Sequence, residues 1–183
     1  MDFSLSIEEK NRLLQTARES ILSALEGRSS QYPEPSDNLK TECGAFVTLH
    51  KNGQLRGCIG HIQAAGPLFD AVIELARSSA FKDPRFPPLS PEEYEKIDIE
   101  ISVLTPLKEI NDISVIEVGK HGIYIQRGYA SGVLLPQVAT EQGWDRETFL
   151  KHTCMKAGMS GDCYKQSDTR IWVFSAIIFG EKQ

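Results

Sequence analysis

A cysteine framed by two glycines is the segment of this sequence with the clearest chemical potential. Residues 55–60 read LRGCIG, so Gly57 and Gly60 flank Cys58. Strand interiors normally avoid glycine, because glycine has no side chain to pack there. The two glycines therefore indicate that something approaches the backbone, and we expect both to contact a ligand. The alternative is a bulged strand with a structural cysteine, since free cysteine is among the most buried residue types.

Two neighbouring features favour a nucleophilic role for Cys58. A reactive cysteine needs a cation, a histidine or a helix N-terminus beside it to stabilise its thiolate. Arg56 lies two residues earlier and points to the same side of a regular strand, where it would bind ligand. A helix that begins near Pro67 would add its N-terminal amides. No Cys-His-Asn signature accompanies them, so the residues alone leave both interpretations open.

The proline-rich segment 83–88, DPRFPP, predicts a stiff loop, because proline fixes its own φ and restricts the residue before it. Such a loop would hold Arg85 as a clamp for a carboxylate or phosphate, with Asp83 beside it in the binding site. Equally, Asp83 and Arg85 would staple the loop to its neighbours by hydrogen bonds.

Residues 97–104 alternate between apolar and polar side chains, which is typical of a half-buried strand. Glu100 lies on the polar side. If that side lines a pocket, Glu100 is a candidate general base or a partner for an arginine. If it faces only solvent, Glu100 is an ordinary surface residue.

His121 and Gln137 complete the candidate site. His121 sits in a glycine-flanked turn and suits proton transfer near neutral pH, although turn histidines also cap carbonyl groups. Gln137 follows Pro136 at the start of a predicted helix, where ligands bind, although simple helix initiation explains it too. We expect Cys58, Arg85, Glu100 and His121 to converge on one cleft. We expect only structural roles for the remaining histidines, His50, His61 and His152.

The cysteine spacing predicts no metal site and no cofactor. The four cysteines, Cys43, Cys58, Cys154 and Cys163, include no CxxC pair, and the CxxH beginning at Cys58 stands alone. The N-terminus lacks signal-peptide features and no apolar run reaches membrane-span length. We therefore expect a cytoplasmic protein with reduced thiols rather than disulfides.

Composition is that of an ordinary globular domain. The chain has 183 residues with a net charge of −5 and no run of lysine or arginine, which argues against nucleic acid as its main partner. Capping boxes begin predicted helices at Ser6 and Ser90, a hairpin turns at Asn52, and residues 170–179 read as one closing strand. Helices and strands mix without regular βαβ alternation, which predicts an α+β fold.

The LRGCIG segment resembles the signature of the AMMECR family, component A of the AmmeMemoRadiSam system. Further segments resemble the family's motifs in the expected order: Gly44–Leu49, Asp83–Pro88, Ile99–Leu104, Gly119–Gly122, Leu135–Ala139 and Lys156–Gly158. The resemblance covers nearly the whole chain, and it implies one domain over 5–183. That domain would contain mixed, largely antiparallel sheets covered by helices, in two interlocked subdomains that share strands.

The resemblance also implies partners but no reaction. Relatives occur alongside a Memo-type protein and a radical-SAM protein, so the chain would be an enzyme or enzyme component that acts on a small polar or nucleotide-like substrate between its subdomains. The radical-SAM partner would supply the iron–sulfur cluster, for which this chain lacks the cysteine spacing. The alternative is a non-catalytic protein that presents a substrate or docks partners. The sequence leaves open whether the chain is an enzyme.

Overall fold

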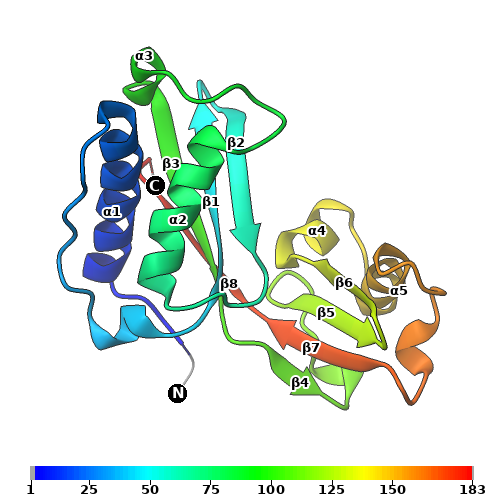
Figure 1. Ribbon diagram of the computed structural model, residues 1–183. Helices are drawn as coiled ribbons and strands as arrows, with labels where there is room; N and C mark the ends of the chain where they lie inside the picture. The colour runs from blue at the N-terminus through cyan, green and yellow to red at the C-terminus, as the bar shows by residue number, and fades with distance from the viewer. Residues whose placement is uncertain (1–2, 183) are drawn as a thin grey trace. The chain divides into compact units, whose positions relative to one another are not determined.

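The computed structural model describes residues 3–182, which form two compact units (Figure 1). The first unit runs to Leu104 and resumes at Ile177, and the second is Thr105–Ala176. The second unit is thus inserted in the sequence between two strands of the first. Each unit contains helices and an antiparallel sheet, which confirms the α+β class.

The first unit packs helices against a sheet in the order β2-β1-β3-β8. Its helices are α1 (Ile7–Glu26), the 3-10 helix η1 (Asp37–Lys40), α2 (Leu68–Phe81) and α3 (Pro91–Tyr94). Its strands are β1 (Gly44–Lys51), β2 (Gln54–His61), β3 (Ile97–Leu104) and β8 (Ala176–Gly180). Both predicted capping boxes are present, at Ser6 with Glu9 and at Ser90 with Glu93.

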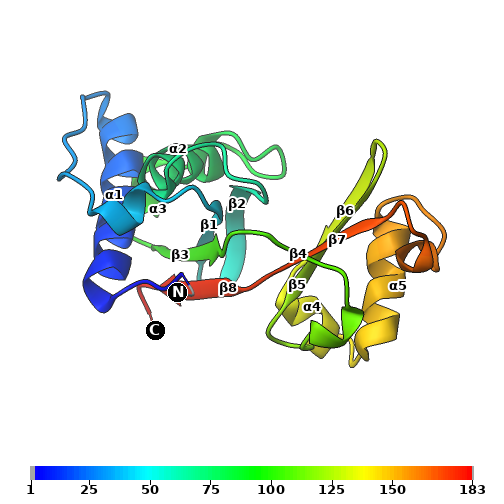
Figure 2. The ribbon, with the colours of Figure 1, turned by 90° about the horizontal axis from the view of Figure 1, so that it is seen from below.

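One face of the first sheet is buried under the helices, and the other is not (Figure 2). Val47 and Leu49 of β1 and Ile99 and Ile101 of β3 are at most 1% exposed and belong to a core shared with α1 and α2. The intervening residues of β3 are only half-buried, so the predicted alternation is confirmed. Half-buried side chains therefore occupy the opposite face, which we call the open face.

The hairpin of β1 and β2 turns at Asn52 and Gly53, as predicted. Both residues have positive φ, 54° and 76°, as a two-residue hairpin turn of type I′ requires. The pairing shifts register between Leu49 and His50, because Leu49 faces Gly57 whereas His50 faces Leu55. Arg56 is the extra residue of this β-bulge.

Helix α2 approaches β2 unusually closely at Gly57. A Cβ atom at this position would lie 2.2 Å from the backbone oxygen of Ser79 in α2. The Ser79 hydroxyl accepts a hydrogen bond from the Ile59 amide (3.0 Å) and donates one to the Val47 carbonyl (2.7 Å). Because Val47 and Ile59 face each other in the β1–β2 ladder, this hydroxyl bridges the two strands.

Gly60 also has a packing role. A Cβ atom there would lie 2.2 Å from the ring of Phe46, which faces it across the β1–β2 pair. The ring therefore covers the glycine from the open face. Protein atoms occupy the space beside both glycines, so close packing accounts for them without a ligand.

The second unit has a sheet in the order β4-β7-β5-β6. Its strands are β4 (Lys108–Ile110), β5 (Gly122–Arg127), β6 (Ala130–Leu134) and β7 (Arg170–Phe174). Its helices are α4 (Pro136–Glu141), α5 (Arg146–Lys156) and the 3-10 helices η2 (Ile113–Val115) and η3 (Cys163–Lys165). Its own core includes Phe149 and Leu150 of α5 together with Ile123 and Ile125 of β5.

The prediction of one closing strand over residues 170–179 is wrong. The run divides into β7, which belongs to the second sheet, and β8, which belongs to the first. Ser175 separates them: its amide donates to the Thr105 hydroxyl, and its carbonyl accepts from the Thr105 amide. Hydropathy alone does not reveal this division, because both halves are apolar.

The prediction that all four cysteines are free thiols is wrong for two of them. Cys154 of α5 and Cys163 of η3 form a disulfide, and both are at most 1% exposed. The C-terminal end of α5 and the turn after it bring these residues together. Cys43 and Cys58 are free.

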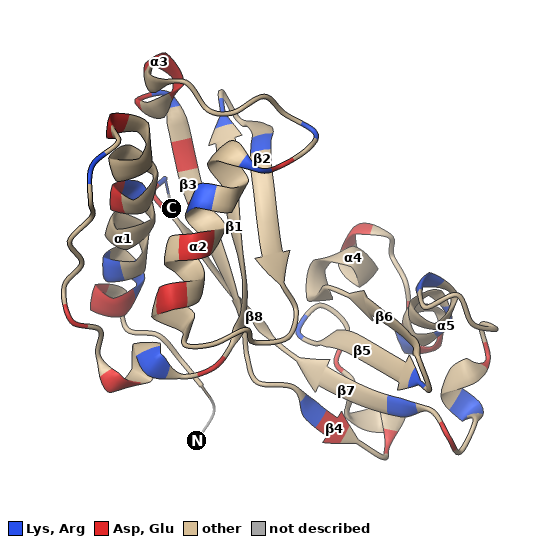
Figure 3. Cartoon of the chain, viewed as in Figure 1, with Lys and Arg blue, Asp and Glu red and all other residues tan. Residues whose placement is uncertain are grey.

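Charge is mixed over the surface. In the view of Figure 3, lysine and arginine are interspersed with aspartate and glutamate rather than forming a continuous basic stripe. Within residues 3–182, none of the helices combines the length and the apolar character needed to cross a membrane.

The close packing at Gly57 predicts that Gly57→Ala destabilises the protein. The added methyl group meets a backbone carbonyl, so α2 or β2 must move, and overpacking of this kind costs about 1–3 kcal/mol. Urea unfolding measures the difference, and Cys58→Ser on the neighbouring, half-buried position is the control, with a smaller expected effect. A stabilised Gly57→Ala protein would show that α2 leaves room at this position.

Candidate functional site

Three polar side chains form a row across the open face. Thr48 of β1 faces Cys58 of β2 on one side and Glu100 of β3 on the other. The Cys58 thiol and the Thr48 hydroxyl are hydrogen-bonded, with Sγ and Oγ1 3.2 Å apart. Directly opposed residues of neighbouring strands have Cβ atoms about 5 Å apart, so the row places a thiol, a hydroxyl and a carboxylate in sequence.

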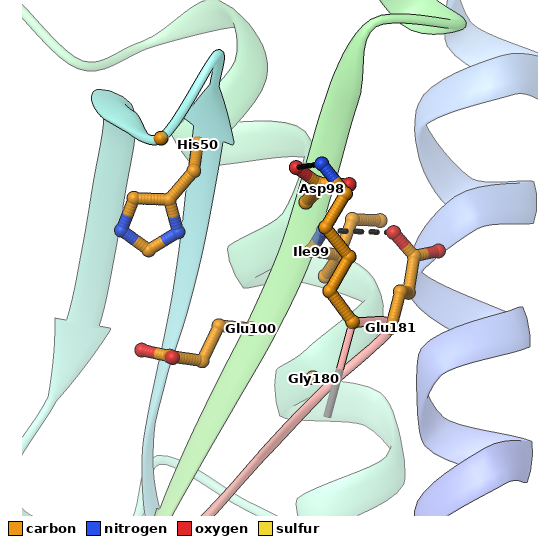
Figure 4. Close-up of a pocket in the computed structure, with 8 residues that line it drawn as sticks. His50, Asp98, Ile99, Glu100, Gly180 and Glu181 are labelled. Carbon is orange, nitrogen blue, oxygen red and sulfur yellow. Dashed lines mark hydrogen bonds and ion pairs between the residues drawn. The ribbon is translucent and has the colours of Figure 1, made fainter.

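Glu100 lines a hollow of about 300 Å³ at the same face (Figure 4). The side chains of His50 and Glu100 both extend from the sheet into this hollow, whereas Asp98 is paired with Lys182. Within the described residues, the side chains of His50 and Glu100 make no hydrogen bond or ion pair. These two groups are therefore available to a ligand or to proton transfer.

The backbone of Cys58 is held by the buried carboxylate of Asp83. This carboxylate accepts hydrogen bonds from the Cys58 amide (2.9 Å) and from the amide and guanidinium of Arg85. The Arg85 guanidinium, followed by the Cys58 and Arg85 amides, holds the pKa of Asp83 well below its usual range. Asp83 is 4% exposed, so it is a structural anchor for the strand that carries the thiol.

Arg85 brings a positive charge to Cys58. Its guanidinium reaches the Cys58 carbonyl at 3.3 Å while 54% of its side chain stays exposed. The pKa of Arg85 is raised, mainly by its hydrogen bonds to Asp83. Both interpretations of the 83–88 loop therefore describe part of the arrangement. Arg85 fixes the loop through Asp83, and its exposed guanidinium lies at the backbone of Cys58.

Arg56 does not join this group. The prediction that Arg56 shares a side with Cys58 assumed a regular strand, but the bulge breaks the two-residue alternation at this position. The Arg56 guanidinium instead binds both oxygens of Glu93 and the Pro87 carbonyl, at 2.8 to 3.0 Å. Arg56 and Lys51 together lower the pKa of Glu93 to about 2. Arg56 therefore fastens β2 to α3.

The expected helix N-terminus is also not beside Cys58. The amide of Leu68, at the start of α2, donates to the Thr41 carbonyl. Ser79, in the last turn of α2, bonds to β2 through the Ile59 amide, and it lies about 16 Å along the helix from Leu68. Arg85 is thus the cation near the thiol, and the α2 dipole does not assist it.

His121 and Gln137 lie in the second unit. The His121 Nδ1 atom accepts a hydrogen bond from the Glu117 amide at 3.1 Å, and His121 lines a separate hollow with residues of β4 and β7. Gln137 is in the first turn of α4, and its carbonyl accepts from the Thr140 hydroxyl. That these residues share a cleft with Cys58 stays a prediction.

Sequence reasoning missed His50, Thr48 and Ser79 as members or supports of this arrangement. His50 and Thr48 lie two residues apart in β1, so an alternation analysis of β1 beside β3 would have placed both on the face of Glu100. Ser79 gives no such signal, because its role depends on the approach of α2. Over the described part of the chain, no group of three or more histidine, cysteine, aspartate or glutamate residues is arranged to hold a metal ion.

Replacement of Asp83 by asparagine is expected to destabilise the protein in a pH-dependent manner. The pKa of Asp83 is lower in the folded protein than the unfolded value of about 3.9, so its ionised form contributes stability above that pH. The contribution is lost as the pH falls through the folded-state pKa. At pH 7, Asp83→Asn should cost about 1.5–3 kcal/mol, and the difference from wild type should shrink below about pH 4.

Denaturant unfolding between pH 7 and pH 3 measures this difference. Asp70→Asn, at an exposed position on α2, is the matched control and should change stability little. A difference between wild type and Asp83→Asn that stays constant over this range would contradict the assigned role of the carboxylate.

Comparisons with known proteins find relatives over nearly the whole chain. The AMMECR1 family model matches residues 14–179. A protein of Methanothermobacter thermautotrophicus is 48% identical, over 97% of this chain and 96% of its own length. Protein MK0488 of Methanopyrus kandleri is 44% identical, over 100% of this chain and 93% of its own length. The crystal structure of the uncharacterized protein PH0010 from Pyrococcus horikoshii superposes with a TM-score of 0.79 at 40% identity, over 97% of this chain and 94% of that one. The chain belongs to the AMMECR1 family.

Proposed function

We propose that the chain is an enzyme, or the catalytic component of one, that acts on a small polar or nucleotide-like substrate at the open face of its first sheet. The observation that carries the proposal is the row of Cys58, Thr48 and Glu100. A thiol bonded to a hydroxyl, with an unpaired carboxylate on the next strand, is a set of groups suited to nucleophilic and acid–base chemistry.

Each group has a distinct role in this proposal. Cys58 is the nucleophile, and the Arg85 guanidinium lies beside it, 3.3 Å from its carbonyl oxygen. Thr48 lies between thiol and carboxylate in the row and is hydrogen-bonded to the thiol, so a water or substrate group that joins Thr48 to Glu100 would complete a path for the proton of Cys58. When the sulfur forms a bond to an electrophilic carbon of the substrate, the thiol proton leaves along this path, and Glu100 returns a proton to the leaving group.

The exposed face of Arg85 and the hollow beside Glu100 supply substrate contacts. The guanidinium suits a carboxylate or phosphate of the substrate, because it retains exposed donors after binding Asp83. His50 and Glu100 suit the polar groups at the other end of the row. Asp83, Gly57 and Gly60 act indirectly, because they fix the strand that carries Cys58.

The proposal includes the partners that the family resemblance implies, a Memo-type protein and a radical-SAM protein. The radical-SAM protein would supply redox chemistry, and this chain would supply the thiol. Co-purification of the three proteins, with Cys58→Ser and Glu100→Gln variants alongside, examines this association separately from catalysis.

Covalent capture at Cys58 tests the proposed function. The purified protein is incubated with a filtered small-molecule extract of the cells that produce it, and its intact mass is measured. The wild type should gain a discrete adduct that maps to Cys58. Cys58→Ser should gain none, and Glu100→Gln should change the adduct yield by about tenfold or more, because a general acid–base contributes about 10²–10⁴ to rate.

Two controls make the outcome decisive. Glu95→Gln removes a carboxylate at an exposed position outside the row and should leave adduct formation unchanged. If the protein instead retains an unmodified small molecule, and Cys58→Ser retains it equally, then the chain is a binding or scaffold protein and the catalytic proposal is wrong.

A further inference from the structure

The second unit contains a hollow that is separate from the groups on the open face. Its volume is about 300 Å³, at the lower end of the range of small-molecule sites. Its apolar wall is formed by Ile110, Val115 and Val173, and Val115 remains 45% exposed. Large apolar side chains around a hollow of this size favour a ligand with an apolar body.

His121 presents a hydrogen-bond donor at the polar side of the hollow. Its Nδ1 atom accepts from the Glu117 amide, so the proton of the neutral imidazole is on Nε2. Burial, followed by the positive charges of Lys120 and Lys108, lowers the pKa of His121 and keeps the ring neutral at pH 7. The ring N–H also donates to the Val115 backbone carbonyl, so a ligand would share this donor with that carbonyl or displace it.

The other polar groups of the hollow also favour an anion. Lys108 and Asn111 line it, and the side chain of neither makes a hydrogen bond or ion pair within residues 3–182. Asp112 is the acidic group of the lining. The Ser114 hydroxyl and amide donate to its two oxygens, at 2.7 and 2.8 Å, and lower its pKa, so its carboxylate is ionised and an anion is favoured only at the Lys108 side of the hollow. The hollow thus has an ammonium (Lys108), an amide (Asn111) and an imidazole (His121) beside its apolar wall.

We infer that this hollow binds a small carboxylate with a short apolar body, such as a medium-chain fatty acid or an aromatic acid. The carboxylate lies among the Lys108 ammonium and the side-chain N–H donors of His121 and Asn111, and the apolar body covers Val115, Ile110 and Val173. An amine of the same shape is disfavoured by the charge of Lys108. A neutral alcohol loses the ionic contact.

The inference is independent of the proposed chemistry at Cys58. All of its residues belong to the second unit, and none belongs to the row on the open face. A binding measurement therefore tests this site, whatever the outcome of the experiments on Cys58.

Titration of the full-length, ¹⁵N-labelled protein with hexanoate tests the inference, with hexan-1-ol and hexylamine as matched probes. Hexanoate should produce saturable shifts of the backbone amide signals of Ile110, Asn111, Val115 and His121. Lys108→Gln should weaken hexanoate binding about two- to fivefold, the size expected for one exposed ionic contact. Val115→Asp should abolish binding, because it replaces apolar wall with a repelling charge.

Lys156→Gln is the control for Lys108→Gln, because it removes the same charge from an exposed position of the same unit outside the hollow. Its affinity for hexanoate should equal that of the wild type. The inference is overturned if hexanoate shifts do not saturate, if hexylamine binds as well as hexanoate, or if the Lys108→Gln and Lys156→Gln variants bind alike.

Discussion

The close approach of α2 to β2 at Gly57 determines where the reactive groups of the first unit lie. The absence of a side chain at Gly57 admits the backbone of Ser79, and the Ser79 hydroxyl then bridges Val47 and Ile59 between the two strands. With β2 held in this way, the Cys58 amide bonds to Asp83. The helix therefore fixes the strand from the buried face, while the thiol occupies the other face.

The polar residues around Cys58 divide into those that hold β2 in place and those that keep groups free for chemistry. Asp83 is buried and fully engaged, and Arg56 is buried against Glu93, so both act on the position of β2. Arg85 and Glu100 retain groups that are free to act. A buried ionised carboxylate such as Asp83 is tolerated only when it is paired and hydrogen-bonded, which explains why two amides and a guanidinium converge on it.

Much of this fold is predictable from local patterns. Helix α1 has its capping box and its glycine C-cap, the hairpin has its Asn-Gly turn, and β3 has its strict alternation, so each element follows from its own residues. The site is less predictable, because it depends on contacts between elements. The bulge at Arg56, the bridging Ser79 and the division of residues 170–179 between two sheets all arise from tertiary packing. The Cys154–Cys163 disulfide contradicted an expectation based on compartment rather than on geometry.

The central claim is that Cys58 is a reactive thiol at the open face, and its alkylation rate tests that claim most directly. Cys43 is an internal control, because burial raises the pKa of its thiol to about 11 and leaves it about a hundredfold less ionised at pH 7 than an ordinary cysteine. With iodoacetamide and peptide mapping, Cys58 should react at least about a hundredfold faster than Cys43, and Arg85→Gln should slow Cys58 about two- to fivefold. A Cys58 as inert as Cys43, or unaffected by the loss of Arg85, would contradict the account.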